Sequence, residues 1–301
     1  MKALATYVMR GRLQSIAISS LFAMLSLIIP PLSYISGAVV ALVTLRRGIS
    51  EGVVIVIAAT MALAVISQIT MGNVLMAVVY AIMVWLPVWV LAIVLRRSIS
   101  LPITLSVAAL ICGLAVLGFH GAVGDTVLWW QGILDKILGE SLQQPGLDVA
   151  EMQLVREKAP QFMTGLMAST FFISMILSLF LARFWQAALY NPGGFKSEFQ
   201  SFRVDKVIAI LGAILMIWAL LAQVPGTLAS DLSIVISVYA SIAGIALVHH
   251  WIVATNSNKS WLILMYLLLV FFTPQILVLL AIIGFADAWM NIRRFYTNRT
   301  I

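Results

Sequence analysis

Charged residues are scarce in this sequence, and cysteine is nearly absent. Only 10% of the 301 residues are Asp, Glu, Lys or Arg, whereas 62% are apolar. A soluble globular chain carries about 25% charged and about 45–50% apolar residues. The single cysteine, Cys112, lies in an apolar run and has no second cysteine to pair with. These deficits exclude an ordinary soluble domain, a disordered chain, a collagen-like fibre, a disulfide scaffold and dithiol redox chemistry.

What the sequence does contain is a series of long apolar runs. Many are about 17–23 residues long, which is the length that crosses about 30 Å of hydrocarbon as a helix. We therefore predict an all-α, polytopic transmembrane bundle of about 8 to 10 membrane segments, forming a single integral membrane domain over residues 1–301. The runs cover residues 13–29, 32–45, 52–69, 74–95, 101–119, 162–182, 204–224, 232–253 and 261–290.

Prolines break the outermost runs. Pro30 and Pro31 follow the first run, and another apolar run resumes at once, which argues against a cleaved signal peptide. Pro274 lies inside the last run. An internal proline removes a helical hydrogen bond and clashes with the preceding turn. We therefore divide this run at residues 271–275 and expect proline-broken helices near both ends.

The basic residues predict the orientation of the chain. With turns at Pro30 and Pro274, ten passes place 15 of the 18 Lys and Arg residues on one side. Short cytoplasmic loops collect Lys and Arg, so both termini are predicted to be cytoplasmic. The net charge of +7 then reflects topology and attraction to anionic headgroups. Because no basic cluster exceeds two consecutive residues, we expect no nucleic-acid partner.

The longer outer connection, residues 120–161, is predicted to form an amphipathic lid. Its apolar residues recur at helical spacing, and Trp129 and Trp130 suit the headgroup level. A break at residues 144–146 leads into a second short helix, about residues 148–158. A lid that seals helix ends is the simpler interpretation. The alternatives are a gate over an outward-facing site and a docking surface for a periplasmic partner.

The inner connection, residues 183–205, is predicted to be a cytoplasmic loop followed by an interfacial helix. The Asn-Pro-Gly-Gly sequence at residues 191–194 is typical of a tight turn. After it, Phe195, Phe199 and Phe202 recur at i, i+4 and i+7. This stripe is expected either to lie in the headgroups or to form a coupling surface for a partner protein.

Ionisable residues are almost absent from the interiors of the apolar runs. At mid-membrane such a group costs about 2.5–3.5 kcal/mol on insertion scales. Asp287 is the one embedded acid, and Asn291 and Arg294 follow it at i+4 and i+7. These three residues predict a polar lock between helices or a coupling site. The other ionisable groups fall near predicted ends: His120, Arg183, Asp231, His249 and His250.

Catalytic and metal-binding motifs are absent from the sequence. There is no HExxH, CxxC, GxSxG or phosphate-binding glycine loop. The adjacent His249 and His250 point about 100° apart on a helix and lack an acidic neighbour at i+3 or i+4. We therefore expect no metal, no cofactor and no enzymatic activity.

Small residues form a ridge on the first predicted helix. Ser15, Ser19 and Ala23 are spaced four residues apart, a pattern that lets helices approach closely. The ridge is expected to pack the protein against itself or against another membrane chain.

Two stretches together resemble the YybS-like bacterial membrane proteins, the domain of unknown function 2232. One runs from Tyr190 to Phe199 and includes Asn191, Pro192, Gly193, Gly194 and Phe195; the other runs from Gly284 to Arg294 and includes Asp287, Trp289 and Asn291. The resemblance implies a bacterial plasma (inner) membrane location. That family is distantly similar to the substrate-binding S components of energy-coupling-factor transporters, although this chain has more helices and no dense outer polar cluster.

The second similarity implies a solute-binding or transport-associated membrane subunit. Such a subunit captures a small, largely neutral solute from outside and works with a membrane or ATPase partner protein. The candidate solute-binding residues lie near the predicted outer ends, where interfacial capping also explains them: Tyr34, Gln68, Asn73, Gln223 and Gln275. The alternative function is a membrane scaffold or assembly factor that recruits protein partners.

Overall fold

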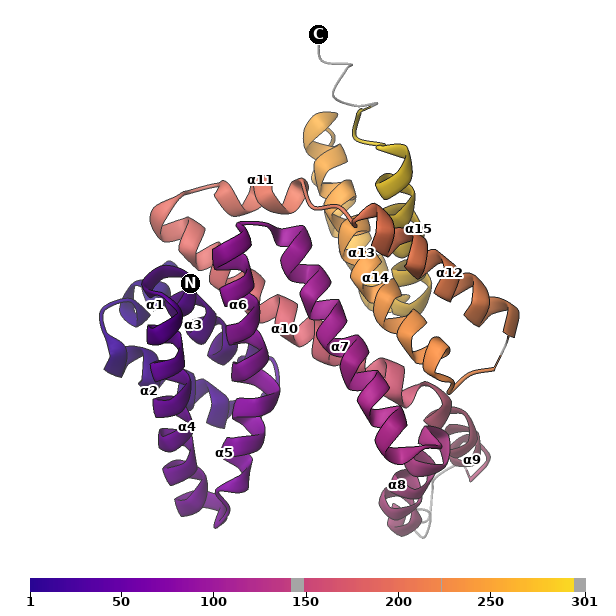
Figure 1. Ribbon diagram of the computed structural model, residues 1–301, viewed down its shortest axis with the longest axis horizontal. Coiled ribbons are helices and arrows are strands. Elements are labelled where there is room, and N and C mark those ends of the chain that lie inside the picture. The colour runs from indigo at the N-terminus through magenta and orange to yellow at the C-terminus, as the bar shows by residue number, and fades with distance from the viewer. Residues whose placement is uncertain (142–148, 223, 295–301) are drawn as a thin grey trace. The chain divides into compact units, whose positions relative to one another are not determined.

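The computed structural model describes residues 1–141, 149–222 and 224–294, and over these residues the protein is helical, with no strand (Figure 1). The predicted all-α fold class is confirmed. The helices are α1 Lys2–Val8, α2 Arg12–Leu25, α3 Leu32–Arg47, α4 Ile49–Met71, α5 Leu75–Tyr80, the π-helical turn η1 Ala81–Trp85, α6 Leu86–Ser98, α7 Leu101–Val123, α8 Thr126–Ser141, α9 Val149–Lys158, α10 Pro160–Tyr190, α11 Gly194–Gln200, α12 Lys206–Ala222, α13 Leu228–Ala254, α14 Ser260–Phe271 and α15 Thr273–Met290.

Within the described residues, six helices are long and apolar enough to cross a membrane. They are α4, the continuous α5–η1–α6 segment, α7, α10, α13 and α15. Three shorter apolar helices, α2, α12 and α14, accompany them. Together with α3, these elements correspond to the ten predicted segments. The protein is a helical membrane protein whose apolar helices contact the lipid bilayer.

The chain comprises two compact units. Unit 1 contains Met1–Ala108 and Ile173–Ser201, and unit 2 contains Ala109–Phe172 and Phe202–Ile301. The boundaries fall inside α7 and α10, so each of these helices contributes residues to both units.

The small-residue ridge of α2 lies inside unit 1. Ser15, Ser19 and Ala23 are all fully buried, and α2 packs against α3 and α4. Ser36 of α3 donates a hydrogen bond to the Ser19 carbonyl at 2.8 Å and accepts one from the Trp85 indole at 2.9 Å. The ridge therefore packs the protein against itself, and its side chains are not exposed to another chain.

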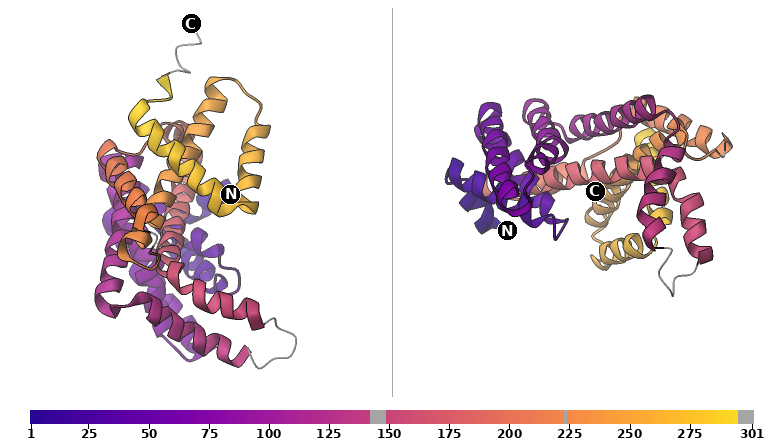
Figure 2. Two further views of the ribbon diagram at one scale, coloured as in Figure 1. Left: turned by 90° about the vertical axis from the view of Figure 1, so that its right-hand side faces the viewer. Right: turned by 90° about the horizontal axis from the view of Figure 1, so that it is seen from below.

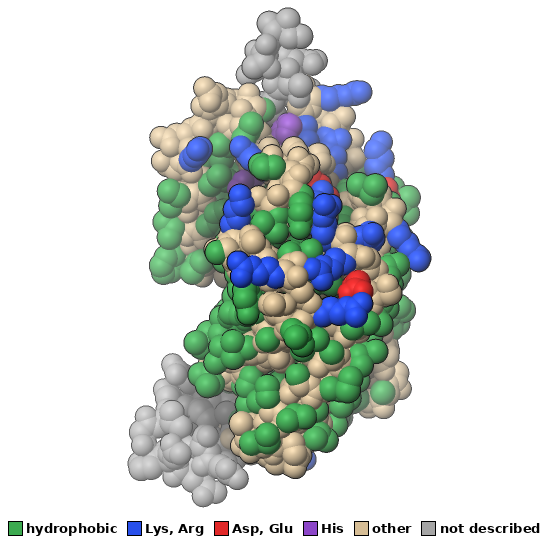
Figure 3. Space-filling model, turned by 90° about the vertical axis from the view of Figure 1, so that its left-hand side faces the viewer, with side chains coloured by type: hydrophobic (Ala, Val, Ile, Leu, Met, Phe, Trp, Pro, Cys, Tyr) green, Lys and Arg blue, Asp and Glu red, His purple; other side chains and the backbone are tan. Residues whose placement is uncertain are grey.

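The apolar face of α4 shows how unit 1 meets lipid. Ile57, Met61, Val65 and Ile69 recur every fourth residue on one face and are each more than half exposed. On the side of unit 1 that Figure 3 faces, hydrophobic side chains cover the lower part, and Lys and Arg gather above them. An exposed apolar face of this kind is suited to acyl chains.

Both predicted helix breaks are present. Helix α14 ends at Phe271, and α15 starts at Thr273 with Pro274 in its first turn, where a missing N–H costs no helical hydrogen bond. Near the N-terminus, α2 ends at Leu25 and α3 starts at Leu32, with both prolines in the intervening turn.

The helices predicted in the two long connections are also present. Helices α8 and α9 form in unit 2, and an exposed Arg156–Asp135 ion pair joins them with a 2.5 Å contact. The neighbouring Asp135 raises the pKa of Arg156 above its ordinary value. The break expected at residues 144–146 lies outside the described residues. In unit 1, α11 follows a turn in which Gly193 has a φ of 88°, a conformation that favours glycine.

Unit 2 is built on a close crossing of α13 and α15, which lie side by side (Figure 1; Figure 2). A Cβ added to Gly244 would lie 2.1 Å from the Leu280 carbonyl oxygen. A Cβ added to Gly284 would lie 2.2 Å from the Ala240 carbonyl oxygen. Both positions therefore require glycine, because any side chain would push the two backbones apart.

Candidate functional site

Two carboxylates are buried in the membrane-spanning helices of unit 2. Asp231 of α13 is 0% exposed and Asp287 of α15 is 1% exposed. A buried charge is stable only when it is paired and hydrogen-bonded. Ionisable residues within membrane segments also mark functional sites by default, so the partners of these two side chains decide their roles.

Asp231 joins three membrane-spanning helices. It lies in the first turn of α13, after the N-cap Thr227, where the helix dipole favours a negative charge. Its Oδ2 is 2.8 Å from Nε2 of His120 in α7, and its Oδ1 accepts a hydrogen bond from the Gly165 N–H of α10 at 3.0 Å. The carboxylate thus connects α7, α10 and α13 through its two oxygens.

Position 165 leaves little room for a side chain. A Cβ there would lie 2.7 Å from Cδ1 of Ile234 and 3.1 Å from both Cα and Oδ1 of Asp231. The Ile234 side chain can rotate away, but Asp231 would also have to shift slightly, so glycine allows the close approach of α10 and α13 at this hydrogen bond.

Aromatic residues of α8 lie next to this site. The Trp130 indole N–H donates a hydrogen bond to Thr164 Oγ1 at 2.9 Å, one residue before Gly165. Trp129 stacks edge-on against Phe119, the neighbour of His120, with ring centroids 5.1 Å apart. The first turns of the predicted lid are therefore fixed beside the His120–Asp231 pair.

The pair has one accessible side. The His120 side chain is 15% exposed, whereas that of Asp231 is 1% exposed. An imidazole hydrogen-bonded to a carboxylate can hold a proton or present its second nitrogen to a ligand. Among the described residues, no cluster of three or more His, Cys, Asp and Glu forms a metal-binding set.

Asp287 lies in a different environment, among arginines. Its Oδ2 accepts from Nε of Arg293 at 2.9 Å and from Nε of Arg203 at 3.2 Å. Arg203 also donates to Asn291, and Arg293 donates to the Phe202 carbonyl at 2.6 Å. Burial lowers the pKa of Arg293, and Asp287 opposes that shift. This cluster ties the chain at residues 202–203 to the end of α15.

The family comparison adds to these sites. Residues 17–288 match the family described as "Predicted membrane protein (DUF2232)". The chain belongs to this family. The match includes Asp231 and Asp287, and it confirms the family resemblance found in the sequence. No curated protein and no solved structure matches the chain.

Arg294, which was predicted to belong to the polar lock, does not join the Asp287 cluster. Asn291 contacts Arg203, but Arg294 is exposed and lies outside the described cluster, where Arg293 takes its place. The i+7 spacing fails because Asn291 has a φ of 52° and ends α15 at Met290. Beyond that point the helical phase no longer applies.

None of the predicted solute-binding residues within the described part of the chain lines a described cavity. Gln68, Asn73 and Gln275 are exposed, and Tyr34 is half-buried. Asn73 accepts a hydrogen bond from the Leu75 N–H at 2.8 Å, which is the capping alternative. Other residues line the cavity of about 160 Å³ in unit 1 and that of about 210 Å³ in unit 2. The remaining candidate, Gln223, lies outside the described residues.

The phenylalanine stripe is also divided. Phe195 and Phe199 are half-buried and pack against Phe180, with ring centroids 5.4 and 5.5 Å apart. Phe202 is 1% exposed and packs against Tyr239 in unit 2. Because α11 ends at Gln200, Phe202 lies beyond the helix that carries Phe195 and Phe199.

Sequence reasoning missed the His120–Asp231 pair. Both residues lie near helix ends on the same predicted side of the membrane, one before the outer lid and one after the next outer turn. The sequence could therefore predict that the two residues lie at the same membrane face. It could not predict that they are neighbours within that face, because the order of the helices along the chain does not give their positions in the membrane plane.

Proposed function

We propose that this protein is a transport-associated membrane subunit that binds a small solute beside the His120–Asp231 pair. The main support is the Asp231 carboxylate, which is fully buried and connects three membrane-spanning helices. It is paired with the partly exposed imidazole of His120. A protein that needed only to anchor or fill the bilayer would be served as well by apolar residues, because replacing a buried ion pair with apolar residues is often neutral or stabilising.

The surroundings of the pair support a binding role. Helix α8 is attached next to it through Trp130 and Thr164, so the first turns of the predicted lid lie at the site. The polar groups at the site are the His120 imidazole and the Thr164 hydroxyl, whose oxygen accepts from the Trp130 indole N–H. Such groups suit a small polar solute held by hydrogen bonds, with aromatic rings for its apolar part.

The remaining features of the proposal concern location and partners. We infer a bacterial inner-membrane location from the family resemblance, and cytoplasmic termini from the basic loops. A membrane or ATPase partner follows from the distant similarity to S components, and the expectation of no enzymatic activity follows from the sequence motifs.

Co-purification tests the proposal. The full-length protein, the Asp231→Asn variant and an Asp135→Asn control would be purified in mild detergent, and retained small molecules and proteins would be identified by mass spectrometry. Asp135→Asn removes an exposed acid of α8 that contacts Arg156 and not the His120–Asp231 pair, so it controls for the loss of one carboxylate. We expect a small molecule with the wild type and the control, and its loss with Asp231→Asn.

Two results would contradict the proposal. One is a wild-type preparation without any retained solute but with a stoichiometric non-transport protein, which would favour a scaffold. The other is a solute retained equally by all three proteins. A His120→Gln variant, checked for monodispersity, provides a second measurement if Asp231→Asn does not fold.

A further inference from the structure

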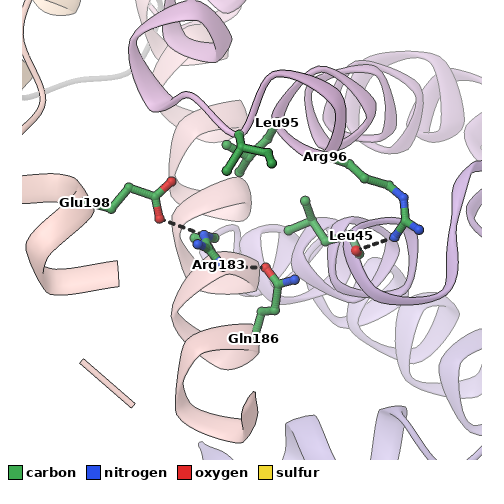
Figure 4. A pocket seen from close by; sticks show the side chains of 7 residues that line it. Leu45, Leu95, Arg96, Arg183, Gln186 and Glu198 are labelled. Carbon is green, nitrogen blue, oxygen red and sulfur yellow. Dashed lines mark hydrogen bonds and ion pairs between the residues drawn. The ribbon is translucent and has the colours of Figure 1, made fainter. Parts of the chain in front are cut away.

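Unit 1 contains a separate polar cavity of about 160 Å³, formed by α3, the α6 end, α10 and α11 (Figure 4). Its walls combine apolar and charged side chains: Leu45, Leu95, Arg96, Arg183, Gln186 and Glu198. One water needs roughly 10–15 Å³ of such volume, so the cavity has room for a group of several heavy atoms.

The cavity holds more positive than negative charge. Arg183 Nε donates to Glu198 Oε2 at 2.8 Å, and Arg183 Nη1 donates to Gln186 Oε1 at 2.7 Å. Arg96 Nη1 donates to the Leu45 carbonyl oxygen at 2.5 Å, but no carboxylate contacts Arg96 among the described residues. The lining therefore carries two guanidinium groups and one carboxylate, and that carboxylate contacts Arg183.

Glu198 sits where an anionic ligand would sit. Its carboxylate accepts from Arg183 in the way that a phosphate oxygen would. It is carried by the short helix α11, which follows the turn at Gly193 and is attached to α10 through Phe195 and Phe199. The Glu198 side chain is 18% exposed, so an incoming anion can reach its bond with Arg183.

The position of the cavity favours a lipid as the source of that anion. The last turns of α3 and α6 border it and carry the paired arginines 46–47 and 96–97 at the ends of apolar helices. Basic helix ends of this kind meet anionic headgroups, and basic pockets between membrane helices bind them. Leu45 and Leu95 provide apolar walls for the glycerol carbons next to the phosphate.

We propose that this cavity binds the phosphate of an anionic phospholipid headgroup between Arg96 and Arg183, and that Glu198 is the internal carboxylate which the phosphate displaces. The site does not rest on the proposed transport function, because it uses other residues in the other unit.

Native mass spectrometry of the full-length protein in detergent tests the site. Phosphatidylglycerol is the probe, phosphatidylcholine tests the need for net negative charge, and inorganic phosphate tests a free anion. Arg183→Gln and Arg96→Gln remove the proposed ligands, and Glu198→Gln removes the competitor. Arg97→Gln is the matched control, because it changes an exposed arginine in the same helical turn that does not line the cavity.

We expect Arg183→Gln to weaken phosphatidylglycerol binding by about tenfold, the loss of one charge-assisted hydrogen bond. Glu198→Gln should strengthen binding, and Arg97→Gln should change it less than twofold, within the range of a rim charge. Equal losses in Arg183→Gln and Arg97→Gln would overturn the site, since attraction would then be a general surface effect.

Three further outcomes are decisive. Weaker binding in Glu198→Gln would overturn the displacement by making Glu198 a ligand. Inorganic phosphate binding as tightly as phosphatidylglycerol would overturn the lipid source, and equal binding of phosphatidylcholine would overturn the charge requirement. If Arg183→Gln does not fold, Arg183→Lys keeps one positive charge without the guanidinium fork and should still bind more weakly than the wild type.

Discussion

Asp231 and Asp287 are both buried in apolar helices of unit 2, but their partners differ. Asp287 is held by the guanidinium groups of two arginines. Asp231 is held by an imidazole and by a backbone N–H. Asp287 therefore joins two cationic side chains in an ionic crosslink, whereas Asp231 joins a histidine ring to the backbone of a third helix. The difference teaches that burial alone does not identify a working site.

Removing Asp287 should have the largest effect of the changes considered. Asp287→Ala leaves two guanidinium groups without their shared carboxylate, and breaking a buried ion pair in this way costs about 3–5 kcal/mol. Thermal unfolding can be followed with a thiol-reactive fluorogenic dye, because the single cysteine, Cys112, is buried in the folded protein.

The matched control for that experiment is Arg294→Ala. This exposed arginine lies outside the described cluster, so its removal should change stability by less than about 0.5 kcal/mol. If Arg294→Ala were as unstable as Asp287→Ala, Arg294 would belong to the ion pair of Asp287, contrary to the structure.

The next largest effect is expected at the α13–α15 crossing. Gly284→Ala places a Cβ against the Ala240 carbonyl, and overpacking of this kind costs about 1–3 kcal/mol. The same dye assay measures it. Gly118→Ala in α7 is the control, because its Cβ meets no described atom within 4 Å. An equal loss in both variants would mean that the crossing is not the cause.

Asp231→Asn should destabilise the protein less than Asp287→Asn. The amide keeps the shape and part of the hydrogen bonding at position 231, so the cost is about 1–3 kcal/mol, whereas an amide at position 287 leaves two arginines unpaired. Adding His120→Gln to Asp231→Asn should cost less than the sum of the single changes, because the residues are in contact. Additive losses would argue against a working pair.

The smallest effect is expected for the attachment of α8. Trp130→Phe removes the indole hydrogen bond to Thr164, worth about 0.5–1.5 kcal/mol, and should increase amide hydrogen exchange in α8. Trp129→Phe should increase amide hydrogen exchange in α8 less than Trp130→Phe does. Trp129 contacts Phe119 through its ring, and phenylalanine keeps an aromatic ring at that position. If amide exchange in α8 became faster only in Trp129→Phe, ring packing and not the Trp130 hydrogen bond would attach α8.

Sequence reasoning predicted the features that depend on local chemistry. Pro274 and the Asn191–Gly194 turn act within a few residues, and the structure has a helix boundary at each. The acid Asp287 stood out because its surroundings in the chain are apolar.

Features that depend on tertiary packing were not predicted. His120 and Asp231 are 111 residues apart, and Arg203 is 84 residues from Asp287. Only the folded arrangement brings them together. Helix phase also misled the prediction where a helix stopped, since Asn291 and the end of α11 moved Arg294 and Phe202 off their expected faces.

Helices α7 and α10 belong to both compact units, and this has a consequence for biogenesis. A gene split at the unit boundaries would cut α7 after Ala108 and α10 after Phe172, inside apolar helices. Each half of α7 would be shorter than the roughly 20 residues needed to span a bilayer and would carry unpaired backbone groups into it. We therefore expect that neither unit can be produced as a separate membrane protein, and that the insertion machinery must complete both helices before either unit can pack.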